Sequence, residues 1–135
     1  MSGAPTHGYS GKPLFQKMGL KSGMSVLVVG KPDHHSELMA GADDVTFRAR
    51  AASADVVHLF CPNLKALETK VAKALEKVAD GGMLWVSWPK KSSPLYKDLT
   101  EDDLRRVILP MGYVDVKVCA VDADWSGLKF VKRKS

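Results

Sequence analysis

The sequence predicts a three-layer α/β domain with a mostly parallel sheet, and three observations lead to this fold class. Short apolar runs alternate with stretches of helical periodicity, which is typical of parallel strands joined by crossover helices. The runs at 25–30 and 54–62 are apolar at nearly every position, as expected for strands covered on both faces. The last two runs are separated only by a turn, so one of them must run antiparallel.

Length and composition indicate a single soluble globular domain. The chain has 135 residues, of which 45% are hydrophobic and 26% charged. A domain of this length buries roughly two-thirds of its unfolded surface, enough for a core without disulfides or metals. No apolar run approaches the roughly 20 residues that cross a bilayer, and the stretch MSGAPTHGYSGKP has no apolar segment of a secretory signal. We therefore expect a cytoplasmic protein in which Cys61 and Cys119 are buried, reduced thiols.

The first half of the chain contains two short helical and two strand-like segments. Residues 1–11, rich in Gly, Ser, Pro and Thr, are predicted to form a flexible arm, and residues 12–135 the domain. Pro13 suits a first helical turn, and Gly19 ends the short helix that follows. The remaining segments are a strand at 25–30, a short helix at 36–42 and a second strand at 44–48.

The second half contains the strongest helix of the sequence. It is predicted over 62–82, with Pro62 near its start, Gly81-Gly82 past its end, and one apolar face formed by Leu64, Leu67, Val71, Leu75 and Val78. Thr100 and Asp103 form a variant of a capping box before a second helix, which follows a strand at 83–88. The closing hairpin is predicted at 113–120 and 128–133, with the partly exposed Trp125 in its turn.

Two resemblances to known families cover these segments. GMSVLVVG is similar to the first motif of class I S-adenosylmethionine-dependent methyltransferases, and DVVHLFCP, LEKVADGGMLWVSW and the hairpin fall where that family has its central strands and its antiparallel end. This resemblance implies a Rossmann-like, methyltransferase-like fold. GYSGKPL, LWVSWPKK and VDVKVCAVDADWSGLKFVKR resemble more closely a family of small bacterial proteins known only as a domain of unknown function. That resemblance spans Gly8 to Arg133 and implies no activity.

The methyltransferase motif itself is degenerate in this chain. The motif has an acidic residue before Gly-x-Gly-x-Gly, whose glycines let the backbone approach the cofactor. Aligned on the strand, the chain has Val28 at the acidic position and Gly30, Pro32 and His34 at the three glycine positions. The family also places an acidic residue at the end of the second strand to hold the ribose, where this chain has Arg48. The sequence therefore argues against S-adenosylmethionine as cofactor.

Several polar residues are predicted to meet at one edge of the sheet. Ligands of open α/β sheets bind beyond the carboxyl ends of the strands, where the strand order reverses. If a cofactor binds in the turn after the first strand, the candidate residues are Gly30, Lys31, Asp33 and His34. Basic side chains and the N–H groups of the helix that starts near Pro62 favour an anion such as a phosphate or a carboxylate. The candidate anion-binding residues are Arg48, Asn63, Lys90 and Lys91, and the alternative is a solvated loop without a ligand.

No metal site is predicted. Asp33, His34 and His35 are adjacent, but neighbouring histidines point in different directions and the spacing fixes no third ligand. We expect these residues to form a polar surface loop. His58 lies within an apolar strand and is expected to be a hydrogen-bonded histidine of the core or of a sheet face.

The sequence therefore predicts a Rossmann-like domain that binds a small anionic ligand or a protein partner and is not a working methyltransferase. The first alternative is a methyltransferase relative that uses S-adenosylmethionine. The second is a weak nucleic-acid binder, acting through Lys90, Lys91 and the basic tail KFVKRKS at a net charge of +5. Against nucleic acid, no arginine and aromatic pattern follows one strand. Catalytic residues and oligomeric state are not assigned.

Overall fold

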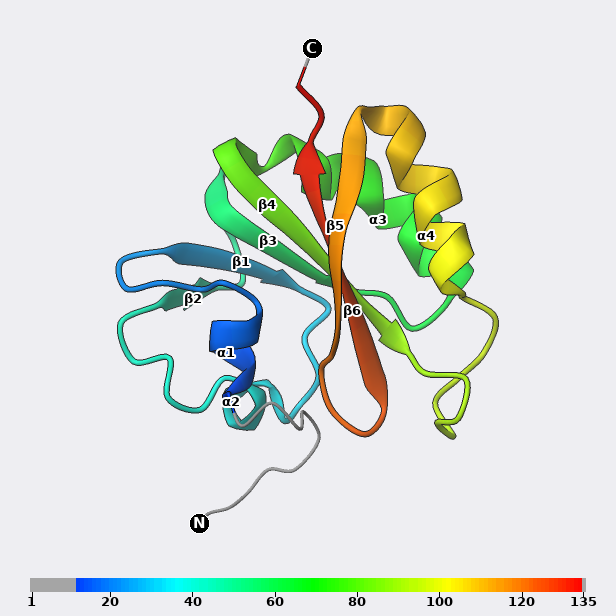
Figure 1. Ribbon diagram of the computed structural model, residues 1–135, viewed down its shortest axis with the longest axis horizontal. Coiled ribbons are helices and arrows are strands. Elements are labelled where there is room, and N and C mark those ends of the chain that lie inside the picture. Colours follow the sequence, from blue (N-terminus) through cyan, green and yellow to red (C-terminus); the bar gives the residue numbers. More distant parts are fainter. Residues whose placement is uncertain (1–11, 135) are drawn as a thin grey trace.

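A computed structural model describes residues 12–134, and its strands form one six-stranded sheet of order β2-β1-β3-β4-β6-β5 (Figure 1). The strands β1 to β4 run parallel to one another, and β6 runs antiparallel to both β4 and β5. The predicted α/β class with a C-terminal antiparallel hairpin is confirmed. The arm predicted over residues 1–11 lies outside the described residues. In chain order the elements are α1 (Leu14–Lys17), β1 (Ser25–Val29), α2 (His35–Leu38), β2 (Thr46–Arg48), β3 (Ala54–Phe60), α3 (Leu64–Glu76), β4 (Val78–Pro89), α4 (Glu101–Ile108), a 3-10 turn η1 (Leu109–Met111), β5 (Tyr113–Ala120) and β6 (Trp125–Lys132).

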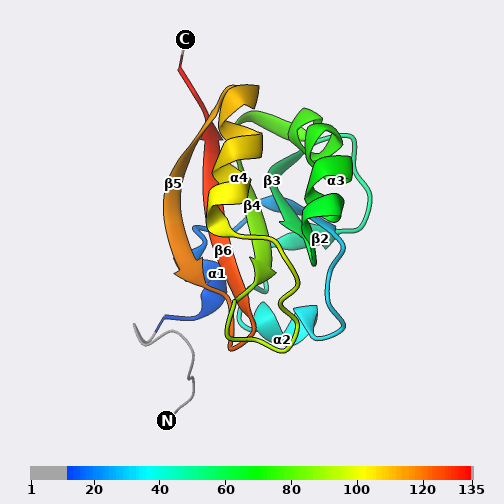
Figure 2. The same cartoon turned by 90° about the vertical axis from the view of Figure 1, so that its right-hand side faces the viewer.

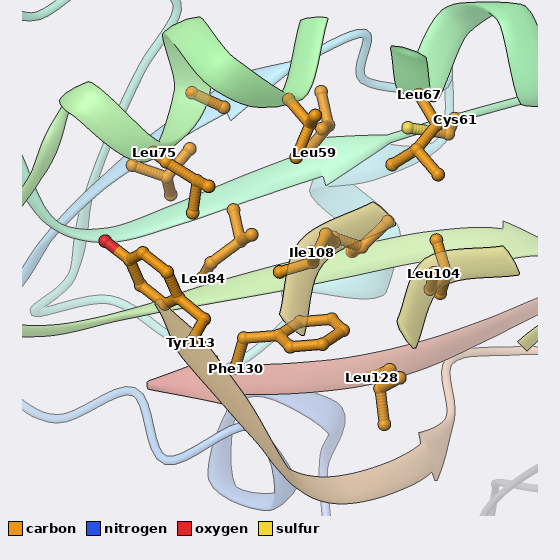
Figure 3. Packing of buried hydrophobic residues seen from close by; sticks show 14 of the residues in the cluster. Leu59, Cys61, Leu67, Leu75, Leu84, Leu104, Ile108, Tyr113, Leu128 and Phe130 are labelled. Atoms are coloured by element: carbon orange, nitrogen blue, oxygen red, sulfur yellow. The ribbon is translucent and has the colours of Figure 1, made fainter. Parts of the chain in front are cut away.

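Helices α3 and α4 cover one face of the sheet. The apolar stripe predicted for α3 is buried at Leu67, Val71 and Leu75, and α4 buries Leu104 and Ile108. These side chains pack against residues of β3, β4 and β6 in one continuous cluster (Figure 3). The predicted capping box of α4 is present, since Thr100 and Asp103 each accept the other's backbone N–H.

The opposite face is covered by the short helices α1 and α2, so the domain has three layers. Figure 2 shows α1 and α3 on opposite sides of the sheet. On this face Leu14 and Met18 pack with β1, β3 and β4 residues in a second cluster. The indole Nε1 of the fully buried Trp85 donates to the carbonyl of Met18 at 3.0 Å, which ties the end of α1 to the centre of the sheet.

Two boundaries differ from the sequence prediction. Val78 continues the helical spacing, but it begins β4 and pairs with Ala54. Gly81 and Gly82 lie inside β4 rather than in a turn. A Cβ on Gly82 would lie 2.5 Å from the carbonyl oxygen of Asp55, so only glycine fits at this position. Trp125 is not in an exposed turn: it begins β6 and is only 8% exposed.

Both cysteines are free thiols, and the helices are short. Among the described residues Cys61 is buried and Cys119 is half-buried. Burial raises the pKa of the Cys61 thiol to about 12. No helix in the described part of the chain is long and apolar enough to span a membrane.

Candidate functional site at the carboxyl ends of the parallel strands

The strand order reverses between β1 and β3. The chain leaves β1 to form β2 on one side and then crosses back to form β3 on the other. The loops that follow β1 and β3 therefore meet at the edge where open α/β sheets bind ligands.

Gly30 forms the turn at the end of β1. Its φ of +73° lies in the left-handed region, and a Cβ at this position would lie 2.9 Å from the carbonyl oxygen of Phe60 at the end of β3. Gly30 is therefore required by the close approach of the two strands, whatever ligand binds there.

His34 connects this turn to the β5–β6 hairpin. Its Nε2 lies 2.8 Å from Oδ2 of Asp122, and Oδ1 of Asp122 accepts the backbone N–H groups of Asp124 and Trp125. Burial acts to raise the pKa of Asp122, but the hydrogen bonds from His34 and the two N–H groups outweigh it and hold the pKa below its ordinary value. The imidazole of His34 is thus committed to a contact within the protein. Asp122 carried no signal in the sequence, because its partner lies far away along the chain.

His35 is buried, which corrects the expectation of a polar surface loop. It is 6% exposed and packs edge-on against Phe47 and Phe60, with ring centroids 5.3 Å and 6.1 Å away. Burial, and then the charges of Lys31 and His34, lower its pKa. Among the described residues its Nε2 has no hydrogen-bond partner. The spacing of His35, Leu38 and Met39 at three and four residues is the sequence signal that could have placed it on an inward helix face.

A pocket lies between the carboxyl ends of β1 and β2. A small hollow of about 40 Å³ is lined by Val28, Lys31, His35, Phe47, Arg48 and Ala49. A wider pocket of about 470 Å³ shares three of these residues and is lined by Lys31, Pro32, Asp33, His35, Ser36, Met39 and Phe47. The structure therefore brings together Lys31 and Asp33 from the candidate cofactor set and Arg48 from the candidate anion set.

The other candidate anion-binding residues lie apart from Arg48. Asn63 caps α3, since its Oδ1 accepts the N–H of Ala66 at 2.8 Å. Lys90 and Lys91 line a separate pocket of about 440 Å³ together with Trp88, Thr100, Glu101, Asp102 and Ser126, so carboxylates lie beside them.

The start of α3 does not offer a free anion site at its first N–H group. The N–H of Leu64 donates to Oδ1 of Asp98 at 2.9 Å, so a carboxylate of the protein already lies at this helix end. The expectation of unpaired N–H groups at the start of the helix is wrong for Leu64 and Ala66. Asp98 follows no strand and no motif, so no sequence pattern points to this contact.

His58 is a buried histidine of the sheet, as predicted. It is fully buried, its Nε2 lies 2.6 Å from the hydroxyl of Ser87, and its ring stacks on Phe60 at 4.1 Å. Burial, and then the charge of His35, lower its pKa to about 3. His34 and His35 point to different partners, as predicted, and the described residues contain no group of three metal-ligating side chains.

Solved structures of other proteins share this fold. The magnesium protoporphyrin IX methyltransferase from Synechocystis PCC 6803, with bound SAH, is 11% identical, with 89% of this chain and 78% of that chain covered and a TM-score of 0.59. An S-adenosylmethionine-dependent methyltransferase from Geobacter sulfurreducens, in complex with S-adenosyl-L-homocysteine, is 12% identical, with 89% of each chain covered and a TM-score of 0.56. A glycopeptide N-methyltransferase is 12% identical, with 87% of each chain covered and a TM-score of 0.58.

At this low identity these likenesses show the fold: the chain has a methyltransferase-like Rossmann fold. No family model matches the sequence, and no curated protein matches it either.

The residues at the site do not fit S-adenosylmethionine in the way the methyltransferase motif holds it. Val28, at the acidic position of that motif, is buried among apolar residues. His34, at the third glycine position, is bound to Asp122. The strand β2 ends at Arg48 rather than at a carboxylate that could accept hydrogen bonds from ribose hydroxyls.

Proposed function

We propose that this chain is a binding domain that holds a small phosphorylated or carboxylated molecule in the pocket between the carboxyl ends of β1 and β2. The observation that carries the proposal is that Lys31 and Arg48, from two different strand ends, line one hollow together with the buried His35. Two cations at one pocket favour an anion, and the guanidinium of Arg48 can hold a phosphate or a carboxylate through two hydrogen bonds.

The environment of His35 supports the same ligand class. His35 lines both hollows, and its buried, unpartnered Nε2 costs the fold about 1–3 kcal/mol that a hydrogen bond to a ligand reaching it would offset. Burial lowers the pKa of His35, which favours the neutral imidazole near neutral pH. Asp33 lines the wider pocket and opposes part of the positive charge there. We therefore place the anionic group of the ligand nearer to Arg48 than to Asp33.

A second candidate function is binding of S-adenosylmethionine by a methyltransferase relative. Structures with the same fold contain the demethylated cofactor, and Gly30 makes a tight turn at the point where the strand order reverses. This candidate needs the cofactor to bind without the carboxylates of the motif.

One set of ligand titrations separates the two candidates. The full chain is titrated by calorimetry and thermal denaturation with inorganic phosphate, adenosine monophosphate, adenosine, S-adenosylmethionine and S-adenosylhomocysteine. The proposal expects binding of phosphate and of the monophosphate but not of adenosine, and a ligand at 100 times its Kd should stabilise the fold by about 2.7 kcal/mol. The variants Lys31→Gln and Arg48→Gln should lose this stabilisation. Lys21→Gln is the matched control, because Lys21 is exposed and lines none of these pockets.

Binding of S-adenosylhomocysteine with no response to phosphate would favour the second candidate. No response to any of the five compounds would contradict both.

A further inference from the structure

A second hollow lies on the other face of the sheet, beside α3. It is a groove of about 710 Å³ with an apolar floor. Leu27 and Val29 of β1 form part of the floor, and Ala74 of α3 forms one wall. The segment Ala49–Ala52 closes the opposite side. We call this feature the α3 groove.

The groove exists because the connection from β2 to β3 is short. Crossovers between parallel strands usually need a dozen or more residues and carry a helix that packs on the sheet. Here only residues 49–53 connect Arg48 to Ala54, and they form no helix. Three of them are alanines, whose small side chains leave apolar surface uncovered over β1.

The charged residues of the rim are all basic. They are Arg50, Lys70, Lys73 and Lys77, and no acidic side chain of residues 12–134 lines the groove. Lys70 and Lys73 lie in α3 and Lys77 is its C-cap, and this spacing of three and four residues places them in one stripe about 10 Å long. Lys77 is held at its end of the stripe by a hydrogen bond from Nζ to the carbonyl of Ala51 at 3.0 Å.

We propose that the α3 groove docks an acidic amphipathic helix of a partner protein. Such a helix would place its apolar side on the floor formed by Leu27 and Val29 and its carboxylates along the basic rim, as in other helix-in-groove complexes. The positive charges are spread along the groove, which matches a helix with acids at successive turns better than an amphiphile with one charged head. This site is separate from the anion pocket and goes beyond the proposed function.

The acidic first turn of α4 from a second copy of this chain would fit the α3 groove less well than a partner helix. In α4, Glu101 is bound to Arg105 and Asp103 to Arg106. A second copy would have to break these ion pairs before its carboxylates could reach the groove.

A designed pair of peptides tests the proposal. Each peptide has about four helical turns with leucines on one face, and the flanking positions carry glutamates in one peptide and lysines in the other. The ¹⁵N-labelled full chain is titrated with each peptide and followed by NMR. We expect the acidic peptide to shift signals of residues 27–29, 49–52 and 69–77 and to bind at least about tenfold more tightly than the basic one.

Surface variants supply the control. The double variant Lys70→Glu/Lys73→Glu should bind the acidic peptide at least about tenfold more weakly than the wild type does. The charge-matched variant Lys21→Glu/Lys97→Glu should bind it with unchanged affinity. All four lysines are exposed. Circular dichroism of both variants is the control for correct folding. Phosphate binding at the Lys31 pocket should persist in both variants, so failure here is distinguishable from failure of the proposed function.

Three titration results would overturn the proposal. The first is equal affinity for the two peptides. The second is that the acidic peptide shifts only NMR signals of residues outside the groove. The third is that dodecyl phosphate binds in the groove and the acidic peptide does not. A concentration-dependent dimer that shields the same residues would assign the groove to a second copy and would also overturn it.

Discussion

Lowering the pH should destabilise this domain through His58. Burial holds the pKa of His58 at about 3, against 6.5 for an exposed histidine. Below pH 6.5 the unfolded chain gains a proton at this position, and the folded chain does not until the pH approaches 3. The stability that neutral His58 provides is therefore complete above pH 6.5 and is lost progressively as the pH falls toward 3.

The size of the stability loss follows from the one proton that the unfolded chain binds at His58 and the folded chain does not. Each pH unit in this window costs about 1.4 kcal/mol of unfolding free energy. At about pH 4.5 the loss relative to neutral pH should therefore be about 2.7 kcal/mol. This is a large part of the roughly 5–15 kcal/mol that stabilises a typical domain.

Urea unfolding between about pH 7.5 and pH 4.5 measures this loss. The pKa values of His35, Asp103, Asp115 and Asp122 are also lowered, and these groups also destabilise the fold in acid. A variant that removes His58 isolates its share. His58→Leu/Ser87→Ala removes both members of the hydrogen bond, so no polar partner is left unpaired. The difference in unfolding free energy between the wild type and this variant should change by about 2.7 kcal/mol between neutral pH and about pH 4.5. Parallel curves for the two proteins would refute the reasoning.

Two further predictions concern local structure. Gly30→Ala should destabilise the fold by roughly 2–4 kcal/mol in urea unfolding, because it adds both left-handed strain and a clash with the Phe60 carbonyl. Gly23→Ala, which has a φ of +87° and no atom near its Cβ, should cost only the strain of roughly 1–2 kcal/mol, and equal losses would rule out the clash. Asn63→Ala should cost about 1 kcal/mol by removing the cap of α3. Asn63→Ser should retain most of that stability, and an equal loss in the two variants would contradict a capping role.

The fold class was predictable because its signals are local. The spacing of Leu67, Val71 and Leu75 defines the buried face of α3, and the apolar run Val26–Val29 defines β1. The same local rule failed at Val78, where pairing with Ala54 across the sheet outweighs the continuing helical spacing. Trp125 was misplaced for a similar reason, because β6 begins earlier than the turn-like composition around Asp122 suggests.

The candidate site was only partly predictable because its contacts are distant in sequence. Lys31 follows β1 and Arg48 ends the neighbouring strand β2, so the parallel-sheet rule placed them at the same edge. The rule does not say which charges already have partners. Asp122 is hydrogen-bonded to His34, and Asp98 accepts the first N–H group of α3. Neither carboxylate is close in the chain to its partner.

The shortness of β2 contributes to both proposed sites, in addition to the short β2–β3 connection beside the groove. β2 ends at Arg48, opposite Leu27, so β1 continues through Val28 and Val29 with no β2 residue paired to them. Val28 lines the hollow with Arg48 on one face of the sheet, and Val29 lines the α3 groove with Arg50 on the other. Successive residues of a strand point to opposite faces, so one unpaired stretch of β1 borders two separate sites. A longer β2 would add backbone beside Val28 and Val29 and narrow both sites together. Because the two sites lie on opposite faces, a ligand in the hollow and a helix in the groove do not compete for the same surface.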